Sequence, residues 1–258
     1  ANKLLSKGLA YRCYCSPEEL DHMRKTASKN GSSRLYNGLW RDKTGSAPQN
    51  KIEPVIRLKV PLEGATTIKD AIQGSVTVSN NTIDDMILVR ADGTPTYMLA
   101  VVVDDHDMNI SHVVRGDDHL TNTFRQIQIY NALDWELPVF AHMPLLHGQD
   151  GNKLSKRHGA LGVGSYRDMG FLPEAINNYL WRLGWSHGND EIIALEDAIK
   201  WFNISDVGKS ASRFDMDKLN NINSHYMKEC DNNRLTKLIL PEISKLIETE
   251  LTPQIENR

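Results

Sequence analysis

The alternation of apolar and polar positions predicts three consecutive regions, of which the first covers residues 1 to about 95. Short β-rich runs at 55–60 and 86–90 are separated here by stretches rich in Gly, Ser, Asn and Pro. A helix is expected from Pro17 to about Lys29, because Ser16 can cap it, proline suits the first helical position and Glu19 completes a capping box. The helix should stop at Asn30-Gly31. We expect a small mixed α/β module.

The second region, residues 96–159, has longer apolar segments. Thr94-Pro95 favours a helix over residues 97–103, although the three valines would also suit a buried strand and periodicity alone does not decide. Apolar residues at helical spacing predict a helix over 119–133. With strands at about 113–114 and 138–145, this helix forms a βαβ unit, and such parallel strands usually place ligands at their carboxyl ends.

The third region, residues 160–258, reads as helices with short connections, and neither a repeat nor a low-complexity segment interrupts it. The expected helices cover residues 173–182, 195–202, 215–227 and 235–247. The fold class is therefore α/β with a helical carboxyl-terminal part.

Composition excludes several protein classes. The 258 residues are 40% hydrophobic and 24% charged, which is typical of a globular chain rather than a disordered one. The longest fully apolar run, Met98 to Val103, is far short of the ~20 residues that a membrane helix needs, so no membrane partner is expected. The first ten residues contain no apolar block like that of a secretory signal. Three sparse cysteines favour a reducing compartment, the cytoplasm.

The net charge of −3 conceals an uneven distribution. Residues 1–60 hold 12 Lys and Arg against 5 Asp and Glu, whereas residues 101–152 hold 2 against 8. The basic end could meet a polyanion such as nucleic acid, or it could be an ordinary solvated face.

A polar loop, residues 148–159, directly follows an apolar strand and carries three cations and one hydroxyl within Lys153-Leu-Ser-Lys-Arg157. These groups can neutralise phosphate oxygens. The loop is not a P-loop, because its glycines lack the required spacing to a Gly-Lys-Ser/Thr.

The order of the residues in this loop resembles the Lys-Met-Ser-Lys-Ser signature of class I aminoacyl-tRNA synthetases. Further blocks, in the same order as in the family, are similar to bacterial-type glutamyl-tRNA synthetases and cover nearly the whole chain. They are residues 8–20, Thr94-Pro-Thr-Tyr97, Val102-Val-Asp-Asp105, His112-Val-Val-Arg-Gly-Asp-Asp-His119, Phe140-Ala-His-Met-Pro-Leu-Leu146, residues 150–159 and Ala211-Ser-Arg-Phe-Asp-Met-Asp-Lys218.

The resemblance implies a two-step reaction of protein synthesis, in which glutamate and ATP give glutamyl-adenylate and the glutamate then passes to the 3′ end of tRNA(Glu). It implies Mg²⁺ with the ATP, no DNA partner and a monomer. It also names the regions: residues 1–95 as a connective insertion that binds the acceptor end, and 96–159 as the second half of a Rossmann-like catalytic domain. Residues 160–228 become a helical stem-contact domain and 229–258 the start of an anticodon-binding region.

The resemblance also implies roles for individual residues. Lys156, and second to it Lys153, would stabilise the charge that builds on the leaving pyrophosphate. Arg115 would bind a carboxylate of the glutamate beside the pocket tyrosine Tyr97. ATP contacts are expected from Ser155, Arg157, His142, Met143, Leu145 and Asp118. Two alternatives stay open: Asp118 could simply cap a helix, and His142 could be a core histidine.

Cys13-Tyr14-Cys15 raises the question of a zinc site, since two thiolates need two further ligands. Some relatives complete such a site about 25 residues later, where this chain has Trp40 and Asp42. We therefore predict no zinc, and we expect the two cysteines to be small core residues.

The His-x-Gly-His motif that grips ATP in class I synthetases does not occur among the 258 residues. We therefore expect this sequence to be the interior of a longer protein and to be inactive alone. Two rival interpretations stay open: a short paralogue that glutamylates a modified tRNA base, and a tRNA-binding fragment without catalysis.

Overall fold

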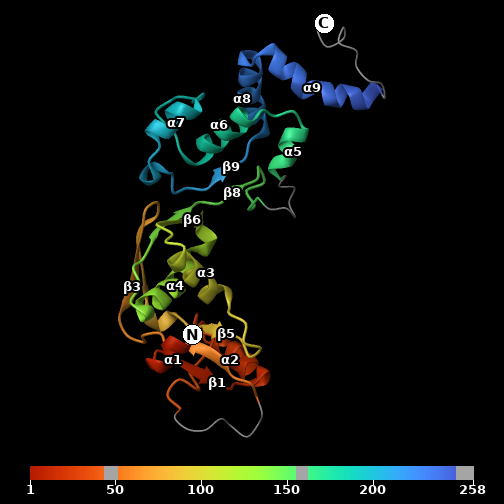
Figure 1. The fold of residues 1–258 in the computed structure, drawn as a ribbon. Coiled ribbons are helices and arrows are strands. Elements are labelled where there is room, and N and C mark those ends of the chain that lie inside the picture. Colours follow the sequence, from red (N-terminus) through yellow and green to blue (C-terminus); the bar gives the residue numbers. More distant parts are fainter. Residues whose placement is uncertain (44–51, 155–161, 248–258) are drawn as a thin grey trace. The chain divides into compact units, whose positions relative to one another are not determined.

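The computed structural model describes residues 1–43, 52–154 and 162–247 (Figure 1). The chain divides into two compact units, residues 1–143 and residues 144–258, and each is described by itself. No helix in the described ranges is long and apolar enough to cross a membrane.

The first unit begins with helix α1 (Asn2–Ser6), strand β1 (Ala10–Cys13) and helix α2 (Pro17–Lys29). The predicted capping box of α2 is present: the Glu19 amide donates to Ser16 Oγ at 3.2 Å, and the Ser16 amide donates to Glu19 Oε2 at 2.8 Å. The helix ends where expected, because Asn30 caps it and Gly31 adopts a φ of +62°.

Strand β1 pairs antiparallel with β2 (Val55–Leu58), which pairs antiparallel with β5 (Ile87–Val89). The two β-rich runs expected from the sequence are thus confirmed as strands, somewhat shorter than predicted. Between them the sequence analysis did not identify a hairpin of β3 (Ala65–Asp70) and β4 (Gly74–Ser79), which is followed by a 3₁₀ turn at Asn80–Thr82.

The predicted βαβ unit is confirmed. Strand β6 (His112–Gly116) runs through a 3₁₀ turn, Asp117–His119, into helix α4 (Leu120–Leu133) and returns as β7 (Val139–Met143), parallel to β6. The register of β6 and β7 places Arg115 opposite His142. The expected strand over 138–145 ends early, because Pro144 lacks an amide hydrogen for the ladder.

Helix α3 (Tyr97–Asp107) settles the alternatives left open for the three valines in favour of the helix. Leu99 and Val102, three residues apart, are its buried residues. The helix packs against α4 (Figure 1). One hydrophobic core joins elements from both sides of residue 95, with Leu58 and Leu88 packing in the same cluster as Leu99, Phe124 and Phe140. The domain boundary at residue 95 stays a prediction.

The second unit is mostly helical, and the four helices predicted from the sequence are confirmed. Its core lies between α6 and α8, where Tyr179 and Leu219 are fully buried. Asp215 caps α8 by accepting from the amides of Asp217 and Lys218. The elements are β8 (Leu146–His147), α5 (Val163–Asp168), α6 (Pro173–Gly184), α7 (Leu195–Trp201), a 3₁₀ turn at Ile204–Asp206, β9 (Ser212–Arg213), α8 (Met216–Glu229) and α9 (Asn232–Ile247).

Candidate functional site

Arg115 lies near the carboxyl end of β6, half-buried, with neutral partners only. Its Nε donates to His142 Nε2 at 3.3 Å, and its Nη2 donates to Thr123 Oγ1 and to Gln126 Oε1, each at 2.6 Å. Nη1 makes no hydrogen bond to another described residue. None of these partners is a carboxylate, and the guanidinium lies beside the carboxyl end of a parallel strand pair, where ligands usually bind.

His142, on β7, is fully buried, so of the two alternatives left open the structure supports a core histidine. Its Nδ1 lies 2.6 Å from Asp70 Oδ2, and Asp70 is the last residue of β3 in the hairpin. Burial by itself raises the pKa of Asp70, but hydrogen bonds from the Gln73 amide and from His142 outweigh it, and the net pKa lies below its usual value.

Tyr97 is the first residue of α3 and is half exposed. It lines a cavity of about 390 Å³ in the first unit, and Arg115 is not among the residues of its wall. The wall instead contains four arginines and one carboxylate, so its charge is strongly positive. The lining residues are Leu20, Arg24, Leu35, Tyr36, Arg57, Asp84, Met86, Ile87, Arg90, Thr96, Tyr97, Met98 and Arg125.

The cavity arginines differ in how they are held. The side chains of Arg24 and Arg125 make no hydrogen bond or ion pair with the described residues, whereas Arg90 donates to the Pro95 carbonyl. Asp84 is occupied by the amides of Leu35 and Tyr36. Two guanidinium groups of the wall are therefore available to an anion, and the aromatic ring of Tyr97 lies in the same wall.

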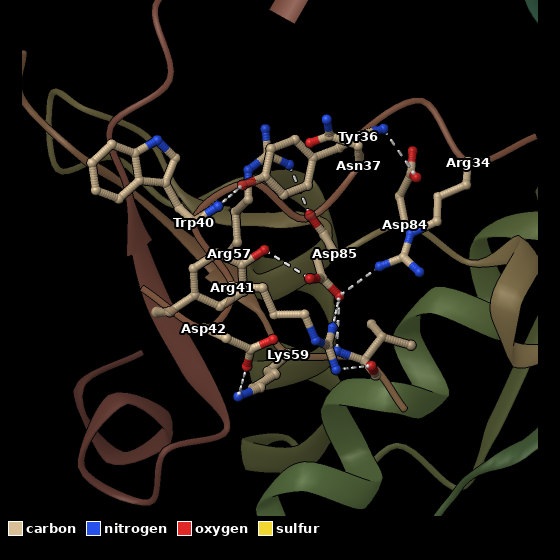
Figure 2. A network of polar contacts seen from close by, with 12 residues as sticks. Arg34, Tyr36, Asn37, Trp40, Arg41, Asp42, Arg57, Lys59, Asp84 and Asp85 are labelled. Atoms are coloured by element: carbon tan, nitrogen blue, oxygen red, sulfur yellow. Dashed lines mark hydrogen bonds and ion pairs between the residues drawn. The ribbon is translucent and has the colours of Figure 1, made fainter. Parts of the chain in front are cut away.

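Figure 2 shows a second buried carboxylate, Asp85, surrounded by cations. Arg41 Nη1 lies 2.5 Å and Arg34 Nη2 3.7 Å from Asp85 Oδ1, and Tyr11 donates to Oδ2 at 2.7 Å. Arg57 donates to the Asp85 carbonyl at 2.7 Å and covers the ring of Tyr36. This network ties the segment 34–42 to β2 and to the residues before β5.

Cys13 and Cys15 are buried beside Tyr36, which confirms their prediction as core residues. The Cys13 thiol lies 3.5 Å from the Tyr36 hydroxyl. Burial, with Cys13 alongside, raises the pKa of Cys15 to about 12, so its thiol stays protonated at neutral pH. Asp42 forms an ion pair with Lys59, and no cluster of three or more His, Cys, Asp or Glu within the described ranges could hold a metal.

The cationic loop belongs to the second unit and is described only in part. Lys153 is exposed and forms a β-bridge with His147, and Leu145 is half-buried just before β8. Ser155, Lys156 and Arg157 lie outside the described residues. In the first unit, Met143 ends β7 and is 38% exposed, and Asp118 is exposed in the 3₁₀ turn before α4, whose first turn carries no side-chain cap.

The structure therefore brings Arg115 and His142 into contact but does not place Tyr97 in contact with them. The sequence analysis missed Asp70, Thr123 and Gln126, which hold this pair. The last two carry a weak signal, since they are polar residues on the helix predicted after β6, but Asp70 is 72 residues from His142 and carries none. The excess of Lys and Arg in residues 1–60 is the feature of the sequence that could have pointed to Arg24 and Arg57 of the cavity wall.

Comparison with known families gives a match over residues 1–221 to the model described as tRNA synthetases class I (E and Q), catalytic domain. A protein named glutamate–tRNA ligase 2 from Rhodospirillum rubrum is 61% identical over 247 residues, 96% of this chain and 53% of the relative. One from Rickettsia felis, of the same name, is 55% identical over 255 residues, 98% of this chain and 55% of the relative.

Among solved structures, a glutamate tRNA ligase from Elizabethkingia meningosepticum in complex with its amino acid is 32% identical, with a TM-score of 0.80. The match covers 99% of this chain and 57% of that one. The chain thus spans about half the length of the relatives it matches, and its fold is that of a class I synthetase catalytic domain with mixed helices and strands.

Proposed function

Because the chain belongs to the family of class I tRNA synthetases of the glutamate and glutamine type, we propose that its protein is a glutamate–tRNA ligase. It would activate glutamate with ATP and transfer it to tRNA(Glu). The observation that carries the proposal is Arg115: a guanidinium held by three neutral acceptors, with one nitrogen left over, suits a ligand carboxylate. Tyr97 would line the remainder of the amino-acid pocket.

The activation step needs cations where negative charge develops. As glutamate attacks the α-phosphate, charge moves onto the leaving pyrophosphate, and cations that hold it better in the transition state lower the barrier. We assign this role to Lys156, with Lys153 second, and phosphate contacts to Ser155 and Arg157. Mg²⁺ would accompany the ATP and offset phosphate charge.

The remaining nucleotide contacts are proposed from β7 and its surroundings. Met143 is the last residue of β7 and Leu145 follows it after Pro144, while Asp118 follows β6. All three therefore lie at or just after the carboxyl end of a parallel strand. His142 is proposed with them from its position in the sequence. Because its side chain is fully buried, it would support the nucleotide site indirectly, through the residues that it contacts.

The arginine-lined cavity supports a nucleic-acid partner for residues 1–95 together with Arg125 of α4. Arg24 and Arg125 would neutralise phosphates at the acceptor end of the tRNA. We propose residues 96–159 as the second half of the catalytic domain, 160–228 as the stem-contact domain and 229–258 as the start of the anticodon-binding region. A cytoplasmic monomer is the expected state.

The test is glutamate-dependent exchange between ATP and pyrophosphate by the complete polypeptide that contains these residues, with and without tRNA. Exchange should occur and should fall by about 100-fold or more in Lys156→Ala. The matched control is Lys200→Ala, an exposed lysine on α7 paired with Asp197, and it should leave the rate unchanged. No exchange under any condition, with tRNA still bound, would favour the non-catalytic binding fragment.

The acceptor-end assignment is tested separately by the salt dependence of tRNA binding. Arg24→Ala and Arg125→Ala should each weaken binding and lower the slope of log K against log salt by about 0.7–0.9. Lys7→Ala, a lysine paired with Asp134 that does not belong to the cavity wall, serves as the control. Glutamate transfer to a modified base, with no charging of the 3′ end, would instead identify the short paralogue.

A further inference from the structure

Behind Arg115 lies a chain of two buried groups, His142 and Asp70, both enclosed in the core of the first unit. We infer that Asp70 and His142 position Arg115 for a ligand carboxylate by fixing the tautomer of the imidazole. The inference rests on the proposed function only for the identity of that ligand, glutamate. Asp70 and His142 act through Arg115 and are positioning residues.

The tautomer follows from counting hydrogens. A guanidinium can only donate, so His142 Nε2, which faces Arg115 Nε at 3.3 Å, must be the acceptor. The hydrogen of the neutral ring is then on Nδ1, which donates to Asp70 Oδ2 at 2.6 Å. The Thr123 hydroxyl accepts from Arg115 Nη2 and lies 2.9 Å from the same Nε2 and 3.4 Å from the His119 carbonyl, so its own hydrogen has an acceptor on either side.

Asp70 is itself held rigidly. Its Oδ1 accepts from three backbone amides, those of Ile72, Gln73 and His142, at 3.0, 2.8 and 3.1 Å. Its Oδ2 is directed to the imidazole alone among these partners. The tip of the hairpin is also fixed to β7, since the Ala71 amide donates to the Phe140 carbonyl. The carboxylate therefore has a single orientation from which to select the tautomer.

The imidazole also separates the two charges. Asp70 does not touch the guanidinium, and no carboxylate in the described part of the chain forms an ion pair with Arg115. Asp105 interacts with Arg115 electrostatically but without such a pair. Asp70 thus orients Arg115 without neutralising its charge. A direct ion pair between the two side chains would neutralise it.

Gln126 shows that this orientation has a cost. Its Oε1 accepts from Arg115 Nη2, so its Nε2 must point the other way, where it is buried without a partner among the described residues. An unpaired buried donor is destabilising.

Asp70→Asn is the decisive substitution, because it is nearly isosteric. The amide oxygen can still accept from the three backbone amides, but the Nδ2 group now donates to His142 Nδ1. The hydrogen of the ring moves to Nε2, where it opposes the N–H of Arg115. We expect the KM for glutamate to rise about 10–100-fold, as for other residues that orient a ligand-binding group, and the KM for ATP to stay within about twofold.

His142→Gln provides the second variant, for a double-mutant cycle with Asp70→Asn. A glutamine oxygen can replace Nε2 as the acceptor for Arg115, but it has no tautomer for Asp70 to select. Asp70→Asn should therefore raise the KM for glutamate far less in the His142→Gln background than in the wild type. Equal effects of Asp70→Asn in both backgrounds would overturn the inference. Asp42→Asn, an exposed carboxylate paired with Lys59, is the control.

The tautomer has its own readout, which does not need activity. In ¹⁵N-histidine NMR spectra of the complete polypeptide, we expect His142 to be protonated at Nδ1 in the wild type and at Nε2 in Asp70→Asn. Protonation at Nε2 in the wild type would overturn the inference that Asp70 fixes the tautomer of His142. A reversed tautomer with an unchanged KM for glutamate would overturn its positioning role. Absence of glutamate-dependent exchange in the wild type would refute the proposed function instead. The wild-type spectrum would still show which nitrogen of His142 carries the hydrogen.

Discussion

Asp85 and Asp70 are two buried aspartates of the same unit whose charges are balanced in different ways. Asp85 is fully enclosed and faces the guanidinium groups of Arg41 and Arg34 directly. Asp70 is compensated by backbone amides and by the imidazole of His142, and Arg115 lies on the other side of that ring. Both arrangements satisfy a buried carboxylate, but they leave the arginines in different states.

The difference separates a structural from a functional use of arginine. In the Asp85 network the arginines are paired with the carboxylate, and these contacts hold the segment 34–42 in place (Figure 2). Around Asp70 the charge of Arg115 is preserved, and only its direction is fixed. Substitutions in the first network should therefore change stability, and those in the second should change ligand binding.

The largest expected effect is on stability, from Asp85→Ala. The substitution would leave Arg41 and Arg34 poorly solvated without their carboxylate, and the loss of one partner of a buried pair typically costs about 3–5 kcal/mol. Urea denaturation followed by tryptophan fluorescence measures it, since Trp40 lies in the segment that the network holds. A loss below about 1 kcal/mol would mean that the network is not a structural clamp.

The next effect is on ligand binding, from Arg115→Ala. We expect kcat/KM for glutamate to fall about 100-fold, or about 2.7 kcal/mol, because a charge-assisted contact to the carboxylate is lost. The unfolding free energy should change less than in Asp85→Ala, since the partners of Arg115 are neutral. Steady-state kinetics and denaturation of the same preparation test both statements. A large loss of stability with unchanged kinetics would make Arg115 another structural arginine.

A smaller effect concerns the pH dependence of stability. The pKa of Asp70 is lowered in the folded state, so its contribution is fully present above the unfolded pKa of about 3.9 and is lost as the pH falls through the folded value. The difference in unfolding free energy between wild type and Asp70→Asn should be constant above about pH 5 and should narrow below about pH 4. A difference that narrows on raising the pH would contradict the assignment.

The smallest effect is expected for Asp42→Ala, which removes the exposed ion pair with Lys59 beside the Asp85 network. Ion pairs between exposed side chains contribute little to stability and are screened by salt. Denaturation at low and high salt should show a small loss that shrinks as salt is added. A loss near that of Asp85→Ala would show that the surface pair belongs to the clamp.

Local signals were sufficient wherever the deciding interaction lies within a few residues. The capping box of α2 joins Ser16 to Glu19. The Thr94-Pro95 start favoured a helix over 97–103, but the three valines left a buried strand open until the structure showed α3. The βαβ unit follows from its apolar periodicity, and Arg115 was found through the motif that surrounds it. The hairpin β3–β4 was missed, because neither of its strands carries a strong apolar run.

The amino-acid sequence by itself thus predicted most of the helices, the strand order of the βαβ unit, the family and a set of candidate residues. Only the tertiary structure decided that Asp70 stands behind His142, that Arg115 keeps its charge, and that Asp85 collects the arginines of a distant segment. The physical reason is the range of the interactions. Caps and amphipathic faces are set by neighbours along the chain, whereas hydrogen bonds between residues 70 and 142 exist only after the core has brought the strands together.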